Sequence, residues 1–303
     1  MQVSLYLHLC GGLTSMKNHI TITNFTDTAC IWCWGTEPIF RALETHYPNL
    51  IEFRYVMGGL VDDINNFSDP GNGIDAGAKG ANEQIVAHWL EAAHHHRMPV
   101  KPEGFHLFSD EFPSTYPQNI AYKAAQLVDP NKADAYLRRV REATLTEAKV
   151  TGNPDVLIEL ACEVGLERAA FSKALKSKEV EQAFHEDLRL NHAAGVEVFP
   201  SFLVESDGEG EPVLLRGYIP YEKFKTVIRS LTQGSLVPTA APPSKEALQD
   251  LLGKHPRLAF EEVFKAFDFA SREQAHLFLE DLISKQILIK EEVGPSYFVR
   301  MGL

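Results

Sequence analysis

Two cysteines separated by two residues are the side chains of this chain best suited to chemistry. They are Cys30 and Cys33, within FTDTACIWCWGTEP (residues 25–38). In the first turn of a helix, this spacing brings the sulfurs close enough to form and break a disulfide without backbone movement. The first sulfur then lies where unpaired N–H groups and the helix dipole favour an anion, which lowers a thiol pKa from about 8.5 to roughly 4 to 7. We therefore expect Cys30 to attack and the more buried Cys33 to resolve the mixed disulfide.

The same pair has two other interpretations. A structural zinc site needs two more ligands, but the sequence has no second CxxC, and Cys10 and Cys162 each stand alone. Inert packing is disfavoured, because chance rarely sets a CxxC between a strand and a helix. Ile31 and Trp32, between the cysteines, offer no polar group to a thiolate, which predicts a less oxidising couple than a histidine-containing loop gives.

The cysteine loop follows a predicted strand and precedes a predicted helix. Residues 19–25 alternate apolar and polar side chains and are rich in β-branched residues, as strands are. From Cys33 to about Thr45 the pattern predicts a helix, which tolerates Pro38 only near its first turns or at a kink. Residues 50–60 predict a second strand, so the chain opens with a parallel strand, helix, strand unit.

The middle of the chain is predicted to be helical. Between about Gly73 and Ala194, apolar residues follow the helical period and are interrupted by Pro, Gly and Asn, which predicts four or five helices. Residues 200–206 and 213–219 predict a hairpin, and residues 221–232 a closing amphipathic helix. The sheet is therefore expected to resume after a helical insertion.

The last part of the chain is predicted to be a separate module. Residues 233–244 are Pro-rich and uncharged, which is typical of a linker. Beyond them the pattern predicts three short helices and a small hairpin, which together suggest a winged-helix-like module. From Lys245 onward, eight Lys and Arg residues stand against ten Asp and Glu residues, so the module lacks the basic face that DNA requires. Contact with a partner protein, or dimerisation, is the favoured role.

The composition is that of a soluble globular protein, with 45% hydrophobic and 23% charged residues. A formal net charge of -12 disfavours nucleic acid as a partner. There is no apolar run of membrane-spanning length, and the short apolar segment at the N-terminus lacks a preceding basic residue. We therefore expect no membrane association and a cytoplasmic location. Residues 1–15 are interpreted as an upstream extension that adds little to the fold.

Two segments resemble a known family. DTACIWCWG, around the cysteine pair, and AAGVEVFPSFLV (residues 193–204) resemble the cysteine loop and the cis-proline segment of DsbA-like thioredoxin-fold oxidoreductases, particularly the FrnE-type branch. The resemblance covers residues 17–232 and includes the order of the predicted elements. It implies an α/β, thioredoxin-like fold with a large all-helical insertion, to which this chain adds a small C-terminal winged-helix-like domain.

In this interpretation the chain has three parts. Residues 17–72 and 195–232 form the thioredoxin-like domain, residues 73–194 form the helical insertion, and residues 245–303 form the C-terminal module.

The resemblance also assigns site residues. Cys30 would be the attacking thiol and Cys33 the resolving thiol. Pro200 would be a cis proline facing the pair, which leaves the backbone of Phe199 free to pair with an extended substrate chain. An ordinary trans proline that opens a strand is the alternative for Pro200.

Other side chains near the pair have less specific interpretations. Trp32 and Trp34 are predicted to line a substrate surface beside Cys30, although a core position suits Trp34 equally. Asp27 and Thr28 are predicted to cap the start of the cysteine helix. Elsewhere, three consecutive histidines (residues 94–96) point about 100° apart on a helix and cannot share one ion, which predicts a solvated helix end. Cys162 is interpreted as a small core residue.

The sequence therefore predicts a dithiol-disulfide oxidoreductase or isomerase that acts on proteins or small thiols and needs no organic cofactor or metal. Two alternatives stay open. The first is a glutathione-dependent isomerase or transferase on the same fold, although that branch carries Ser where this chain has Cys30. The second is a non-catalytic adaptor that holds partner proteins through the insertion and the C-terminal module.

Overall fold

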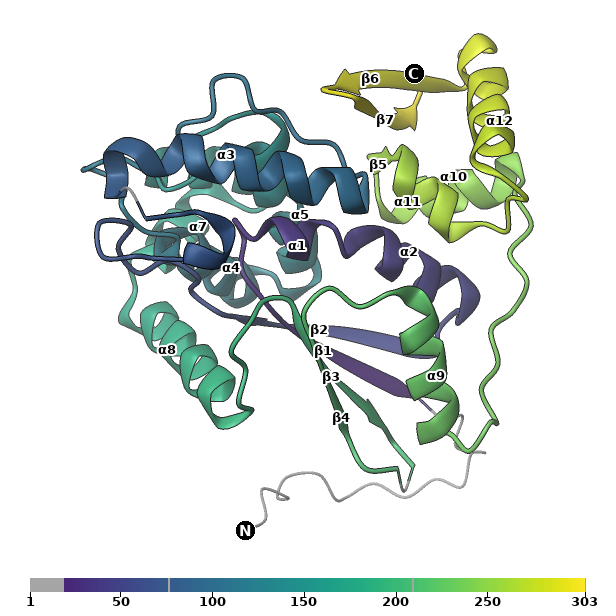
Figure 1. Ribbon diagram of the computed structural model, residues 1–303, viewed down its shortest axis with the longest axis horizontal. Coiled ribbons are helices and arrows are strands. Elements are labelled where there is room, and N and C mark those ends of the chain that lie inside the picture. Colours follow the sequence, from purple (N-terminus) through teal and green to yellow (C-terminus); the bar gives the residue numbers. More distant parts are fainter. Residues whose placement is uncertain (1–18, 76, 209, 303) are drawn as a thin grey trace.

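A mixed sheet of four strands lies at the centre of the protein. The structure is a computed structural model that describes residues 19–75, 77–208 and 210–302, so the predicted extension at residues 1–15, with Cys10, lies outside it. The strand order is β2-β1-β3-β4; β2 is parallel to β1, whereas β3 is antiparallel to both β1 and β4 (Figure 1). The strands are β1 (Ile20–Thr26), β2 (Ile51–Met57), β3 (Ser201–Ser206) and β4 (Val213–Arg216).

Two helices cover one face of this sheet. They are α2 (Glu37–His46) and α9 (Tyr221–Leu231). The apolar residues of β1 alternate with polar ones, and the buried Ile22 packs in one cluster with Phe40 of α2 and Phe224 of α9. A parallel strand, helix, strand unit followed by a hairpin and a helix is the thioredoxin-like arrangement, so the predicted fold is confirmed.

The predicted helix after the cysteine loop is two helices, and Pro38, which the sequence allowed only near a helix start or at a kink, lies at the start of the second. Helix α1 (Ile31–Trp34) ends at Gly35, and α2 begins two residues later. Pro38 lies in the first turn of α2, where its missing N–H costs no helical bond. Gly35 is required by its neighbour, because a Cβ there would lie 2.5 Å from Cδ2 of His96. A short turn therefore separates the cysteine pair from the main helix.

Six α-helices lie between β2 and β3 in the described part of the chain, not four or five. Three of them lie between Pro154 and Ala193, separated by short turns. Gly165, with a φ of 78°, ends the first of them, and the side chain of Ser177 caps the last by accepting the N–H of Val180 at 3.3 Å. The helices are α3 (Gly77–His96), α4 (Tyr116–Val128), α5 (Pro130–Thr146), α6 (Pro154–Glu163), α7 (Arg168–Leu175) and α8 (Lys178–Ala193), preceded by the short 3₁₀ helix η1 (Pro70–Asn72).

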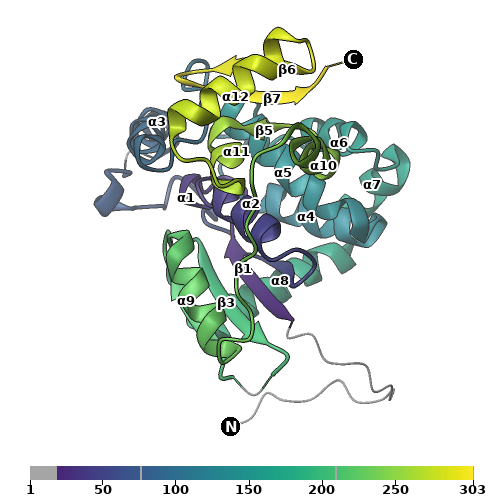
Figure 2. The same ribbon diagram turned by 90° about the vertical axis from the view of Figure 1, so that its right-hand side faces the viewer.

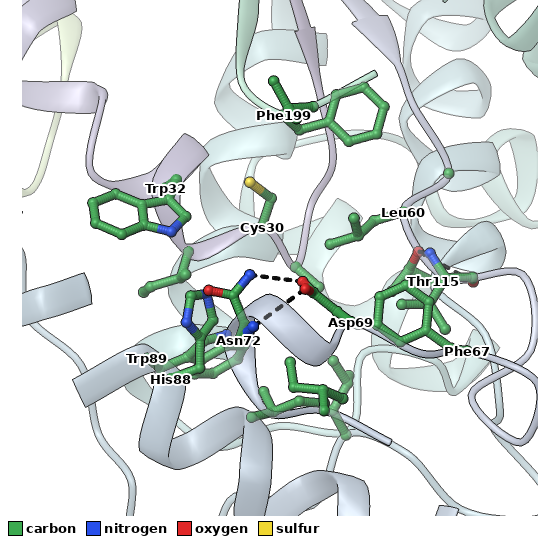
Figure 3. A pocket seen from close by; sticks show the side chains of 18 of the residues that line it. Cys30, Trp32, Leu60, Phe67, Asp69, Asn72, His88, Trp89, Thr115 and Phe199 are labelled. Atoms are coloured by element: carbon green, nitrogen blue, oxygen red, sulfur yellow. Dashed lines mark hydrogen bonds between the residues drawn. The ribbon is translucent and has the colours of Figure 1, made fainter. Parts of the chain in front are cut away.

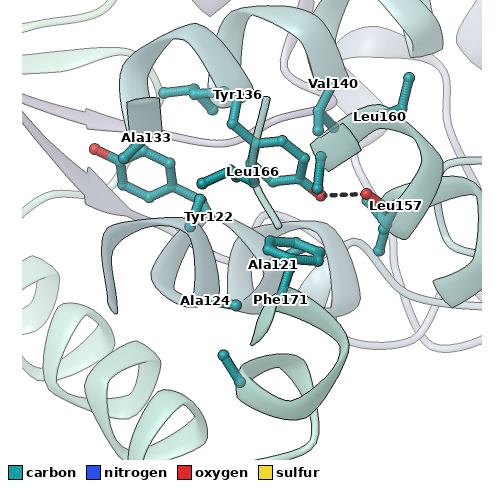
Figure 4. Packing of buried hydrophobic residues seen from close by; sticks show 14 of the residues in the cluster. Ala121, Tyr122, Ala124, Ala133, Tyr136, Val140, Leu157, Leu160, Leu166 and Phe171 are labelled. Atoms are coloured by element: carbon teal, nitrogen blue, oxygen red, sulfur yellow. Dashed lines mark hydrogen bonds between the residues drawn. The ribbon is translucent and has the colours of Figure 1, made fainter. Parts of the chain in front are cut away.

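The insertion has a hydrophobic core of its own. Tyr122, Tyr136 and Phe171 are buried between α4, α5 and α7, and the Tyr136 hydroxyl donates to the carbonyl of Leu157 at 3.0 Å (Figure 4). Met57, at the end of β2, belongs to the same cluster. The insertion therefore packs against the end of the sheet at which the cysteine loop begins.

The C-terminal module has the predicted helices and hairpin, with one added strand. Its elements are α10 (Lys245–Lys254), β5 (Leu258–Ala259), α11 (Phe260–Ala266), α12 (Arg272–Ser284), β6 (Leu288–Val293) and β7 (Ser296–Met301). The sheet order β5-β7-β6 and the order of elements are winged-helix-like. The module lies over α2, on the side away from the main sheet, and α11 packs along α2 (Figures 1 and 2). The residue boundaries of the three predicted domains stay a prediction.

Candidate functional site

The cysteine pair lies at the C-terminal end of β1, where α1 begins. Cys30 and Cys33 are joined by a disulfide, with their Cα atoms 5.2 Å apart. Cys30 is the N-cap of α1, and its Sγ accepts the backbone N–H of Cys33 at 3.2 Å. Cys33 is fully buried, whereas Cys30 lines a cavity (Figure 3). Of the two cysteines, only Cys30 is among the residues that line this cavity.

Asp27 anchors the cysteine loop and does not cap α1. Sequence reasoning predicted a cap from Asp27 or Thr28, but the capping atom is the sulfur of Cys30, and Thr28 donates to Gln118 at 2.6 Å. Burial raises the pKa of Asp27 above its ordinary value of 3.8, because desolvation outweighs its hydrogen bonds. The donors to its carboxylate are the N–H groups of Ala29 (2.8 Å) and Leu60 (2.8 Å) and the side chains of Asn119 (2.7 Å) and Thr115 (3.1 Å).

The segment before β3 forms one wall beside the pair. The Phe199–Pro200 peptide bond is cis, and the ring of Phe199 lies next to Cys30 (Figure 3). Gly58, just after β2, makes room for this ring, since a Cβ there would lie 2.1 Å from Cζ of Phe199. Sequence reasoning missed Gly58. Its position was a usable signal, because the ends of the parallel strands β1 and β2 meet at one edge of the sheet.

A cavity of about 800 Å³ opens at Cys30. Its polar side chains include Asp69 and Asn72, which bond to each other, and His88 (Figure 3). No Lys or Arg lines it among the described residues. The cavity therefore suits an uncharged, apolar segment better than an anion. Its large apolar side chains include Trp32, Leu60, Phe67, Trp89, Phe108 and Phe199.

The helical insertion supplies much of this apolar lining, which sequence reasoning missed. Ile85 and Trp89 lie one turn apart on α3, and both are buried and line the cavity. That apolar stripe was the available signal, but nothing local showed that it faces Cys30.

Trp32 lies half-buried among other rings. Its ring centroid is 5.6 Å from that of Tyr218 and 6.0 Å from those of His95 and His96. The prediction of a solvated helix end is wrong for His96, which is 2% exposed because α3 turns it toward the cysteine helix. Burial lowers the pKa of His96 to about 3, so its imidazole is neutral at neutral pH.

Trp34 does not line the cavity, contrary to its predicted place on the substrate surface. It is fully buried, and its indole N–H donates to the carbonyl of Pro99 at 2.9 Å. Its ring packs between Arg138 of the insertion and Phe298 of the C-terminal module. The core position, which the sequence also allowed, is the one that the structure shows.

No described helix is long and apolar enough to cross a membrane. No group of three or more His, Cys, Asp or Glu side chains in that part of the chain is arranged to hold a metal ion. Cys162 is free and only partly buried, so it is not the core residue that the sequence predicted.

A comparison with protein families places this geometry in context. Residues 24–226, about two thirds of the chain, match the model of a family described as Thioredoxin. The chain belongs to the thioredoxin family.

Named relatives of this thioredoxin-family protein match beyond that region. The ClpXP adapter protein SpxH of Halalkalibacterium halodurans is 26% identical over 273 residues, 90% of this chain and 85% of the relative. SpxH of Shouchella clausii is 27% identical over 271 residues, 89% of this chain and 84% of the relative. The unmatched tenth of this chain is shorter than residues 245–303, so the match extends into the C-terminal module.

A solved structure shares the thioredoxin-family fold. The cytosolic disulfide reductase DsbM of Pseudomonas aeruginosa superposes with a TM-score of 0.53 and 23% identity, over 69% of this chain and 98% of DsbM. At this identity the likeness shows the fold alone. The fold and the Cys30–Cys33 pair confirm the resemblance to DsbA-like oxidoreductases, whereas the FrnE-type branch stays a prediction.

Proposed function

We propose that this protein is a thiol-disulfide oxidoreductase in which Cys30 attacks and Cys33 resolves. The observation that supports this assignment is the hydrogen bond from the Cys33 N–H to the Cys30 Sγ, at 3.2 Å. In the reduced protein, a donor in this position favours the thiolate over the thiol. The fully buried Cys33 has no such access to substrate, and its sulfur is already within bonding reach of Cys30.

The proposed thiol-disulfide exchange consists of two successive displacements. The Cys30 thiolate attacks one sulfur of a substrate disulfide, which forms a mixed disulfide and releases the other substrate sulfur as a thiolate that takes up a proton. Cys33 then loses its proton and attacks the Cys30 Sγ, which releases the second substrate sulfur. The substrate gains two electrons, and the protein is left with the disulfide that the structure shows. An external thiol must reduce that disulfide before another cycle.

The cavity favours a polypeptide substrate over glutathione. Glutathione carries two carboxylates, and no Lys or Arg is among the described residues that line the cavity. The backbone groups of Phe199 take no backbone hydrogen bond in the described part of the chain, because the pairing of β3 with β1 begins at Ser201. An extended chain that pairs with Phe199 would place an apolar side chain in the cavity and its sulfur at Cys30.

Reduction of insulin by glutathione, with the protein as catalyst, tests this function. Wild type and the control Cys162→Ser should accelerate the reaction equally, whereas Cys30→Ser should abolish the acceleration. Cys33→Ser should stop turnover and accumulate a mixed disulfide at Cys30, visible by mass spectrometry. Equal activity of Cys30→Ser and wild type would refute the proposal.

We also propose a cytoplasmic location. There, an abundant thiol such as glutathione would supply the external reductant that the cycle needs.

Adapter function in protein degradation is the second candidate. It is favoured by the SpxH relatives, which are named as ClpXP adapters and whose match extends into the C-terminal module. A ClpXP degradation assay on proteins that copurify with the chain tests it. An adapter speeds their degradation whether or not Cys30 is replaced by Ser, whereas an oxidoreductase alone leaves the rate unchanged. Contact with partner proteins through the C-terminal module belongs to this candidate.

A further inference from the structure

Trp34 connects the cysteine pair to the C-terminal module. It follows Cys33 directly in α1, and its side chain is fully buried. The guanidinium carbon of Arg138, on α5, lies 4.5 Å from the centroid of the indole ring. The ring of Phe298, on β7, lies 6.3 Å away at 51°. A residue of the CxxC helix is therefore enclosed partly by a module that begins more than two hundred residues later.

Arg138 joins the same three parts through buried ion pairs. Its two terminal nitrogens donate to both carboxylate oxygens of Glu262, on α11, at 2.8 Å each. Its Nε donates to Glu142 at 2.7 Å, and Nη1 also reaches Glu37, the first residue of α2, at 3.3 Å. Glu262 is fully buried, and a bidentate pair of this kind fixes orientation as well as distance. The guanidinium that packs on Trp34 is thus held in place by the C-terminal module.

Phe298 gives a second route to the same ring. The guanidinium of Arg257 lies 3.7 Å from the Phe298 centroid, and Arg257 donates to Glu291 at 2.8 Å. Phe298 belongs to one buried cluster with Ala29, Ile31 and Trp34, the residues around the cysteines. Phe298 and Arg138 therefore both pack on the Trp34 ring.

The hairpin turn of the module also approaches the segment that accepts the Trp34 indole N–H. Gly294, with a φ of 55°, lies between β6 and β7, and a Cβ there would be 2.6 Å from the carbonyl oxygen of Val100. Val100 follows Pro99, whose carbonyl accepts the Trp34 indole N–H. The module therefore supplies Phe298, binds Arg138 through Glu262, and approaches the residue after Pro99.

We propose that the C-terminal module sets the redox equilibrium of the Cys30–Cys33 pair, with Glu262 and Phe298 as positioning residues that act through Arg138 and Trp34. The held turn keeps the two cysteine Cα atoms 5.2 Å apart, within the range that a disulfide needs. If the turn loosens, the dithiol gains more conformational entropy than the disulfide, because the disulfide stays cross-linked. An intact module thus favours the disulfide. Because coupling is reciprocal, the disulfide also favours the docked module.

The redox equilibrium of the full-length protein with glutathione tests this proposal. Two molecules of glutathione supply the two electrons and two protons that convert the disulfide to a dithiol, and alkylation with mass spectrometry reports the reduced fraction of the Cys30–Cys33 peptide. Phe298→Ala and Glu262→Gln should each shift the equilibrium constant about fivefold toward the dithiol, which is about 20 mV for a two-electron couple. Phe278→Ala is the matched control, because its ring packs on Phe269 within the module and should leave the equilibrium unchanged.

Hydrogen exchange supplies a readout that does not require Phe298→Ala or Glu262→Gln to fold. In the wild type, reduction should increase exchange in β7 and α11, whereas in the Cys30→Ser, Cys33→Ser double variant a reductant should change nothing. The proposal would be overturned if the equilibrium constants of Phe298→Ala and Glu262→Gln stayed within twofold of wild type. It would also be overturned if reduction left hydrogen exchange in β7 and α11 unchanged. Neither measurement requires turnover of a substrate, so a failure of the insulin assay leaves the proposal standing.

Discussion

Around the cysteines, backbone N–H groups and buried side chains, rather than surface charges, set the position of the reactive sulfur. Cys30 caps its own helix, and Asp27 holds the loop before it through donors from three separate segments. The cysteine pair itself could be predicted from spacing alone. The partners of Asp27 could not, since Leu60 and Asn119 reach it only when the chain after β2 and helix α4 are folded around the loop.

Asp27→Asn tests this anchoring and its dependence on pH. An amide replaces one acceptor oxygen by a donor that faces other donors, so the free energy of unfolding should fall by about 1 to 3 kcal/mol. The folded pKa of Asp27 is raised, so the folded state binds the proton more tightly than the unfolded state. The contribution of Asp27 to the free energy of unfolding is therefore fully present below the ordinary pKa of 3.8. It is lost as the pH rises through the pKa of the folded state. Urea unfolding of both proteins should show a stability difference that shrinks as pH rises above 3.8; a difference that grows would contradict the raised pKa.

Gly58→Ala tests the wall made by Phe199. The new Cβ would lie 2.1 Å from the end of the Phe199 ring, so the ring must leave its present position beside Cys30. We expect insulin reduction to slow at least tenfold, with a stability loss of about 1 kcal/mol from overpacking. Gly253→Ala is the matched control, because nothing lies within 4 Å of its added Cβ and α10 gains a better helix former. Unchanged activity of Gly58→Ala would show that the position of Phe199 does not matter for the reaction.

At the scale of helices and strands, the elements with strong local signals were predicted, and those that depend on distant contacts were not. The strand, helix, strand opening, the later hairpin and the module's three helices follow from periodicity and turn residues. The break before α2 was partly signalled by Pro38, but the close approach of the His96 ring to Gly35, from more than sixty residues away, had no local signal. The strand β5 has only two residues, too few for any period, and it exists because it pairs with β7. The apolar cavity was missed for the same reason, since α3 shows an apolar stripe but not what it faces.

Ser177→Ala tests the cap that divides two helices of the insertion. The Ser177 hydroxyl accepts the N–H of Val180, and no Gly or Pro marks the boundary between α7 and α8. Loss of this cap should lower the free energy of unfolding by about 1 kcal/mol. The control is Ser230→Ala at an exposed position within α9, where the change should be neutral or slightly stabilising. Chemical denaturation of both variants measures the difference, and equal values would show that the cap contributes nothing.

Across the whole molecule, the C-terminal module has the element order of DNA-binding winged helices without their charge. The exposed residues of α12, which occupies the place of a recognition helix, include Glu273, Glu280 and Asp281. Its Arg272 is already paired with Glu261. Labelled duplex DNA at physiological salt should therefore show no change in anisotropy with the protein at micromolar concentration. Binding that weakens steeply with added salt would reveal a basic face that the charges do not indicate.

The depth of the Cys30 sulfur limits which proteins it can meet. Cys30 is 5% exposed, and residues of both the sheet end and the insertion line the cavity at its sulfur. A cystine fixed on the convex exterior of a rigid protein cannot come within the bonding distance of about 2 Å, whereas one carried on a slack, unwound stretch can. Under the proposed function, this depth would favour cystines in partly unfolded proteins over those on rigid surfaces.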